Sequence, residues 1–82
     1  MKDIVIISIY DTLIYSVLLD GKVYESHDRY EREKSGEKNV ADEIDDIYAK
    51  ANWQSGKYKK AFKKKFPNKQ VILCENGDIE VL

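Results

Sequence analysis

The sequence predicts a single α+β domain, in which an antiparallel three-stranded meander is followed by a helical segment and a C-terminal β-hairpin. Three observations lead to this fold class. β-branched apolar stretches lie toward both ends of the chain, apolar residues recur at helical spacing in the middle, and two-residue turn signals separate the extended stretches. Because 82 residues can bury only one modest core, we expect the order β-β-β-α-β-β within one domain, residues 1–82.

The first half of the chain contains the three strands of the meander. Residues 4–10 are apolar on both alternating sets, which is typical of a central strand that is covered on both faces. Residues 13–19 and 22–26 flank Asp20-Gly21, a hairpin signal, and are therefore expected to pair. Closure at this turn predicts one buried set of side chains: Leu13, Tyr15, Val17, Leu19 and Tyr24.

A polar connection is expected between the meander and the helical segment. Residues 27–38 include one aromatic and no aliphatic residue, so nothing in them offsets the entropy of ordering. We predict that this stretch is a flexible connection or a frayed extension of the third strand.

The helical segment begins at Asn39, a good N-cap residue with Asp42 three positions later. Apolar residues then follow at helical spacing: Val40, Ile44, Ile47, Tyr48 and Ala51. The same spacing continues past Ser55-Gly56 through Tyr58, Phe62 and Phe66. One helix over 40–66 and two helices broken near Gly56 are both compatible with this pattern, and Pro67 ends the segment either way.

The C-terminal hairpin is indicated by Asn76-Gly77, which lies between the apolar stretches 70–74 and 78–82. Tight closure places four side chains on one face, which we expect to pack on the helical segment: Ile72, Cys74, Ile79 and Val81.

The formal net charge of −1 conceals a segregation of charge along the chain. Residues 1–46 contain six Lys or Arg and twelve Asp or Glu, whereas residues 47–74 contain eight Lys and no acid. A 28-residue segment with one sign of charge creates a local field that suits a phosphate backbone or an acidic partner.

Catalytic and metal-binding motifs are not found in the sequence. There is no nucleotide-binding glycine pattern and no nucleophile elbow, and a single His and a single Cys do not make a zinc site. We expect His27 to face solvent, Cys74 to be a small core residue, and the acidic residues 42–46 to be solvated near a helix N-terminus. The sequence therefore predicts a protein that is not an enzyme and has no metal or cofactor.

Lysines provide the candidate binding site. A solvated helix face usually interleaves acids with lysines, but none occurs among these eight. On a continuous helix Trp53 points outward between lysines, where it could stack a base, whereas a break near Gly56 would turn it onto the sheet as a core or rim residue. The predicted nucleic-acid-binding residues are Lys50, Trp53, Lys57, Lys60, Lys63 and Lys64.

Two resemblances add expectations. Residues 4–25, with Ile-Val-Ile-Ile-Ser-Ile and Val-Leu-Leu-Asp-Gly-Lys-Val, resemble the opening meander of the RNase H-like and actin-like ATPase folds, without the carboxylate that those families carry near the end of the first strand. In length, in Lys/Ile/Tyr-rich composition and in lacking enzyme motifs, the chain resembles small bacteriophage anti-defence proteins of the anti-CRISPR or antitoxin type. That class resemblance implies an inhibitor that binds a host protein or ribonucleoprotein.

These observations lead to two functional hypotheses. The first is a non-catalytic phage-type inhibitor or sequestering factor that uses the Lys-rich helix toward RNA or a ribonucleoprotein. The alternative is a protein-binding inhibitor or homo-oligomeric module that acts through an acidic surface mimicking nucleic acid. We further expect a homodimer or larger assembly, because the core is small and terminal strands leave open edges, and a cytoplasmic location without membrane contact.

Overall fold

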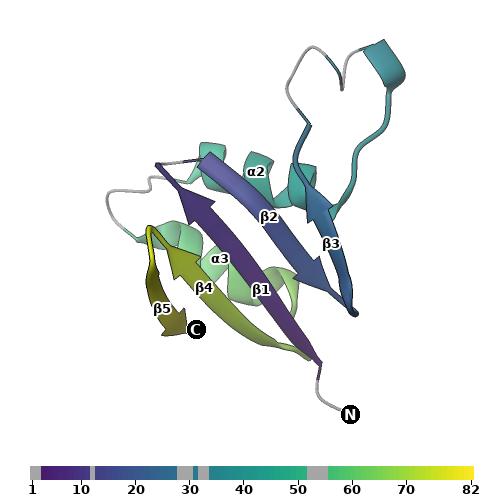
Figure 1. The fold of residues 1–82 in the computed structure, drawn as a ribbon. Coiled ribbons are helices and arrows are strands. Elements are labelled where there is room, and N and C mark those ends of the chain that lie inside the picture. Colours follow the sequence, from purple (N-terminus) through teal and green to yellow (C-terminus); the bar gives the residue numbers. More distant parts are fainter. Residues whose placement is uncertain (1–2, 12, 28–30, 32–33, 52–55) are drawn as a thin grey trace.

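The computed structural model describes residues 3–11, 13–27, 31, 34–51 and 56–82. These residues form an α+β fold in which two helices lie on one face of a five-stranded sheet (Figure 1). The elements are β1 (Ile4–Tyr10), β2 (Leu13–Leu19), β3 (Lys22–Glu25), α2 (Val40–Lys50), α3 (Lys57–Lys65), β4 (Gln70–Glu75) and β5 (Asp78–Val81). The predicted fold class is confirmed, and the order of elements is β-β-β-α-α-β-β.

The sheet is mixed, with the strand order β3-β2-β1-β4-β5. Antiparallel pairs join β1 to β2, β2 to β3 and β4 to β5, as the meander and the hairpin require. β1 and β4 pair in parallel, and a parallel pair needs a long crossover connection. α2 and α3 belong to that crossover, which is why both cover the same face of the sheet.

Two helices, rather than one continuous helix, follow the meander. α2 begins with a capping box, in which the Asn39 side chain accepts from the backbone N–H of Asp42 and the Asp42 carboxylate accepts from the backbone N–H of Asn39. α3 begins after Gly56, whose φ of 74° lies in the left-handed region that glycine adopts without strain. The continuous-helix alternative is therefore wrong.

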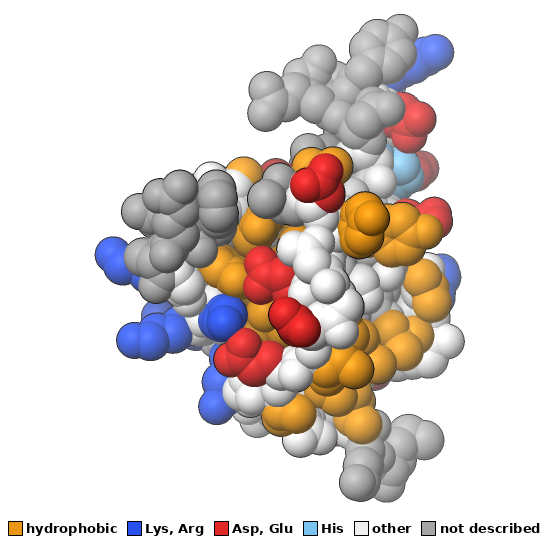
Figure 2. Space-filling model, turned by 60° about the vertical axis from the view of Figure 1, so that its left-hand side comes forward, with side chains coloured by type: hydrophobic (Ala, Val, Ile, Leu, Met, Phe, Trp, Pro, Cys, Tyr) orange, Lys and Arg blue, Asp and Glu red, His pale blue; other side chains and the backbone are white. Residues whose placement is uncertain are grey.

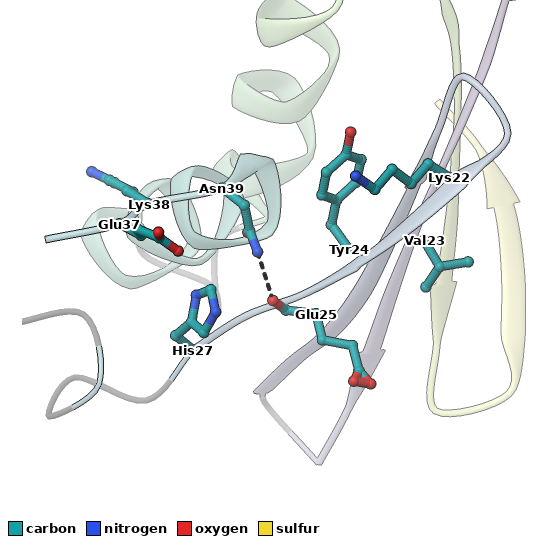
Figure 3. A pocket seen from close by; sticks show the side chains of 8 residues that line it. All are labelled: Lys22, Val23, Tyr24, Glu25, His27, Glu37, Lys38 and Asn39. Carbon is teal, nitrogen blue, oxygen red and sulfur yellow. Dashed lines mark hydrogen bonds between the residues drawn. The ribbon is translucent and has the colours of Figure 1, made fainter. Parts of the chain in front are cut away.

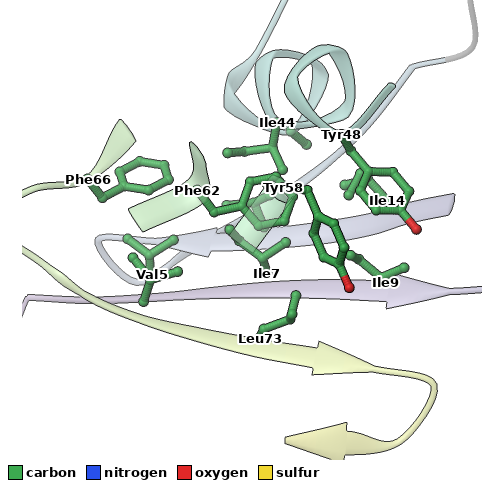
Figure 4. Packing of buried hydrophobic residues seen from close by; sticks show 13 residues of the cluster. Val5, Ile7, Ile9, Ile14, Ile44, Tyr48, Tyr58, Phe62, Phe66 and Leu73 are labelled. Carbon is green, nitrogen blue, oxygen red and sulfur yellow. The ribbon is translucent and has the colours of Figure 1, made fainter. Parts of the chain in front are cut away.

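The core lies between the helices and the sheet (Figure 4). Tyr58 and Phe62 of α3 and Tyr48 of α2 form an aromatic cluster, with edge-to-face packing of Tyr48 on Tyr58 at 5.1 Å between ring centroids. The aliphatic side of the core comes chiefly from the strands and α2: Val5, Ile7, Ile9, Ile14, Val17, Ile44, Val71 and Leu73. Tyr58 and Phe62 thus join the same core as Ile44, as their spacing predicts.

The predicted buried set of the meander is partly wrong. Leu13 and Tyr15 are 66% and 68% exposed, whereas Ile14 is buried. The register shifts by one residue between Ser8 and Ile9 of β1, so Tyr15 has no counterpart there. An extra residue in a strand reverses the alternation beyond it, and simple period-2 counting cannot detect it.

The predicted face of the C-terminal hairpin is also wrong. Val71 and Leu73 are the β4 residues that face the helices, and Ile72 and Cys74 point to the opposite side. β4 is apolar on both alternating sets, so its own pattern does not distinguish the two faces. We name the side of the sheet away from α2 and α3 the open face.

Candidate nucleic-acid interface

α3 presents lysines to solvent because its apolar residues are few and regularly placed. Tyr58 and Phe62 lie four residues apart and are buried against the sheet, which fixes the orientation of the helix. Six of its nine residues are lysines, and its first turn contains no acid. The side of α3 opposite the core is therefore strongly basic.

Some of the lysines near this helix are held by carboxylates. Lys59 Nζ lies 2.8 Å from Glu80 Oε1, Lys65 Nζ lies 3.1 Å from Glu43 Oε2, and Lys69 Nζ lies 3.1 Å from Asp20 Oδ1. The hydrogen bond with Glu80 raises the pKa of Lys59. These lysines stabilise the packing of α3 and the loop after it against the rest of the chain.

The remaining lysines of α3 form what we name the basic face: Lys57, Lys60, Lys63 and Lys64. All four are exposed, and no ion pair joins them to another described residue. Lys50, at the end of α2, is exposed and likewise has no ion pair among the described residues. Trp53, the predicted stacking residue, lies outside the residues that the structure describes.

The geometry of the basic face suits a linear polyanion. Lys57, Lys60 and Lys64 follow the spacing i, i+3, i+7, which puts them in one stripe about 10 Å long on a helix. A stripe of positive charge of this length can follow the phosphates of a nucleic-acid strand. Figure 2 shows lysines gathered on the left of the molecule, on the α3 side.

Helix stability does not account for the whole basic face. Lysines in the last turn of α3 suit the helix dipole, which explains Lys63 and Lys64. Lys57 is the first residue of the helix, and the preceding Gly56 makes no side-chain cap hydrogen bond. A cation at that end opposes the dipole at a cost of about 0.3–1 kcal/mol. A local cost of this kind is often found where function selects the residue.

The acids of α2 are engaged within the chain. Asp42 is fully buried, so the prediction that it is solvated is wrong. Glu43 pairs with Lys65, and Asp46 pairs with Lys38. At least three positions of the acidic stretch therefore have partners within the chain.

Asp42 joins three parts of the chain through its carboxylate. Its Oδ1 accepts from the His27 backbone N–H at 2.7 Å, and its Oδ2 lies 2.9 Å from both the Asn39 backbone N and His27 Nδ1. We name these contacts the His27–Asp42 clamp. It fixes His27, the second residue after β3, to the N-terminus of α2. The prediction of a solvent-facing His27 is correct only in part, because its side chain is 36% exposed but is held by Asp42.

The clamp shifts the pKa of both partners. The hydrogen bond with Asp42 raises the pKa of His27 above its ordinary value of 6.5. Burial by itself raises the pKa of Asp42, but the hydrogen bonds from His27 and Asn39 outweigh burial and lower that pKa overall. The arrangement favours an ionised carboxylate beside a protonated imidazole.

An open hollow of about 840 Å³ lies beside the clamp (Figure 3). The Asn39 side chain crosses to the Glu25 backbone carbonyl at 2.9 Å and closes one side. Its described lining residues include no serine, threonine or cysteine. The lining consists of Lys22, Val23, Tyr24, Glu25, His27, Glu37, Lys38 and Asn39.

The described residues contain neither a metal-binding cluster nor a membrane-spanning helix. Within the described residues no three His, Cys, Asp or Glu side chains gather in a way that could hold a metal ion. Neither described helix has the length and apolar character needed to cross a bilayer. The chain matches no protein-family model, no curated protein and no solved structure.

Sequence reasoning found the basic face but missed the clamp. The spacing of Asn39 and Asp42 identifies a capping box, and that signal was available. The contact between Asp42 and His27 spans 15 positions, and nothing in the local pattern indicates it.

Proposed function

We propose that this protein is a non-catalytic RNA-binding protein that contacts the phosphate backbone through the basic face of α3. One observation carries the proposal: the lysines of the basic face have no carboxylate partner among the described residues, whereas three acids of α2 do have partners. Positive charge is thus available for a ligand. This distribution favours a basic binding surface over the alternative of an acidic surface that mimics nucleic acid.

The strength of binding is expected to depend steeply on salt. If Lys57, Lys60, Lys64 and one further lysine each contact a phosphate of a single strand, log K should fall against log salt with a slope of about −3. Fluorescence anisotropy of a labelled single-stranded RNA, titrated between about 50 and 200 mM KCl, measures this slope. No binding at about 50 mM KCl would refute the proposal.

A matched pair of variants separates the basic face from total charge. Lys60→Gln with Lys64→Gln removes two lysines of the basic face and should flatten the slope by about 1.4. Lys59→Gln with Lys65→Gln removes the same charge from the same helix, but from lysines that already pair with carboxylates. The second variant should change the slope much less. Equal effects of the two would show that net charge, not the basic face, controls binding.

Trp53 stays a sequence-based expectation, because it lies outside the described residues. Base stacking is worth about 1–3 kcal/mol and is insensitive to salt. Trp53→Ala should therefore weaken RNA binding by that amount without changing the slope.

The narrower hypothesis, that the bound RNA belongs to a host defence complex which this protein inhibits, rests on the class resemblance alone. Its test is whether the Lys60→Gln, Lys64→Gln variant loses protection of phage growth in cells while the Lys59→Gln, Lys65→Gln variant keeps it. Full protection by both variants would refute an inhibitory role for the basic face.

A further inference from the structure

The open face of the sheet is apolar from one edge to the other. The strand registers align one residue from each strand into a single row across all five: Val23, Leu18, Ile6, Ile72 and Val81. In the next row, Cys74 and Ile79 continue the apolar surface, and the small side chains of Ser8 and Ser16 lie beside them in the same row. Among the described strand residues, Glu25 at one edge is the single charged side chain at the register positions of this face.

The described residues leave this face uncovered. Val23, Val81 and Ile79 are 61%, 57% and 72% exposed, and the residues between them are half-buried only by their neighbours in the sheet. The open face, which faces the viewer in Figure 1, is seen obliquely on the right-hand side of the molecule in Figure 2, where hydrophobic side chains gather. A soluble chain rarely exposes such a continuous apolar surface unless another surface covers it.

The sequence pattern supports the same conclusion. β1 and β4 are apolar on both alternating sets, which is typical of strands that are buried on both faces. α2 and α3 cover only one of those faces. The pattern thus indicates that the open face of β1 and β4 is covered as well, and no described residue of this chain covers it.

We propose that a second copy of this chain covers the open face, sheet against sheet, in a symmetric homodimer. The five strands contain 28 residues, which at about 3.3 Å per residue and about 4.8 Å between strands give a face of roughly 440 Å² in projection. The accessible area follows the ridges of the side chains and exceeds this projection, so a contact over the whole face reaches the lower end of specific interfaces, about 600 Å² per partner. The interface is therefore of the size that a dimer needs.

The chemistry of the face favours a second copy over other occupants. The apolar row is nearly free of charge, so two copies can meet without opposing like charges, and neither an acidic nor a basic partner finds a complementary group in it. A wide, flat sheet packs best on another sheet, about 10 Å away, as in β-sandwiches. This arrangement also leaves α3 of both copies on the outside.

Charged substitutions at the ends of the row test the proposal. Val23 and Val81 are mostly exposed in the single chain, so Val23→Lys with Val81→Lys should fold normally. Sedimentation equilibrium should give twice the 9.6 kDa chain mass for the unmodified protein and the single-chain mass for this variant. Ala49→Lys, at an exposed site on α2, should remain dimeric and serves as the control for added charge. Circular dichroism checks that each variant is folded.

A charge-reversed partner gives a rescue whether position 23 of one copy meets position 23 or position 81 of the other. Val23→Glu with Val81→Glu should also be monomeric alone, but an equimolar mixture with the lysine variant should form dimers. A monomeric unmodified protein at high micromolar concentration would overturn the proposal and leave the face to a different partner. A dimer that survives both substitutions would also overturn it, because its interface would then lie elsewhere.

Cys74 offers a second measurement on the unmodified protein. It is the one cysteine of the chain and lies on the open face. Its alkylation by iodoacetamide should slow as protein concentration rises, and this dependence should vanish in the Val23→Lys, Val81→Lys variant. An alkylation rate that does not change with the concentration of the unmodified protein would contradict the proposed interface.

Discussion

Asp42→Asn is expected to destabilise the fold far more than Asp46→Asn, the same change one helical turn later. The Asp42 side chain is fully buried and accepts three hydrogen bonds, two of them from backbone N–H groups. An asparagine has one acceptor oxygen where aspartate has two, so at least one of these donors, that of His27 or of Asn39, loses its partner. A buried donor without a partner costs about 1–3 kcal/mol, and we expect a loss of about 2 kcal/mol.

This loss is large for so small a domain. At about 0.05–0.15 kcal/mol per residue, the whole chain is stable by about 4–12 kcal/mol. A loss of 2 kcal/mol lowers the melting temperature of such a domain by about 8–16 °C. The measurement is urea unfolding followed by circular dichroism, together with a thermal melt.

Asp46→Asn is the matched control. Asp46 pairs with Lys38 at a partly exposed position on the same helix, and such pairs contribute about 0–1 kcal/mol. We expect its melting temperature to stay within a few degrees of the unmodified protein. If Asp42→Asn and Asp46→Asn differ by less than 0.5 kcal/mol, a value within the usual effect of surface substitutions, the stabilising role of the His27–Asp42 clamp is refuted.

Two further predictions concern groups in the core and the clamp. His27, the one histidine of the chain, should titrate by NMR with a pKa above 6.5, and Asp42→Asn should return that pKa toward 6.5. Because the pKa is raised in the folded state, the contribution of His27 to stability is complete below pH 6.5 and is lost as pH rises through the folded-state pKa. The buried Tyr48 hydroxyl has no partner among the described residues, so Tyr48→Phe should be neutral or stabilising by up to about 1 kcal/mol, whereas Tyr58→Phe removes the 2.8 Å hydrogen bond to Glu75 and should cost about 1–3 kcal/mol. A destabilising Tyr48→Phe, or a neutral Tyr58→Phe, in urea unfolding would contradict this reasoning.

Local signals predicted the elements of the fold well. Asp20-Gly21 and Asn76-Gly77 do form the turns of hairpins, and the residues at 20, 21, 76 and 77 all have positive φ. The capping residue Asn39 marks the start of α2 as expected. These features depend on a few neighbouring residues, which is why the sequence alone identifies them.

Faces and long-range partners were harder to predict. A single extra residue at Tyr15 reversed the alternation of β2, and β4 offers two apolar sets of similar strength. The partner of Asp42 is set by the path of the chain after β3, which leaves no periodic trace. The basic face was predictable because it depends on helical spacing and on the absence of acids over a long segment, both of which are properties of the sequence itself.

The proposed dimer changes what the basic face can bind. In a sheet-on-sheet dimer, two α3 helices lie on opposite outer layers, about 30 Å apart across four layers. A short RNA can reach only one of them, so its affinity per chain should stay the same when dilution separates the dimer of the unmodified protein into single chains. A longer RNA that wraps to both gains effective concentration and should bind the dimer more tightly. RNA length therefore separates the two proposals, because loss of the dimer removes the advantage of long RNA and leaves short-RNA binding intact.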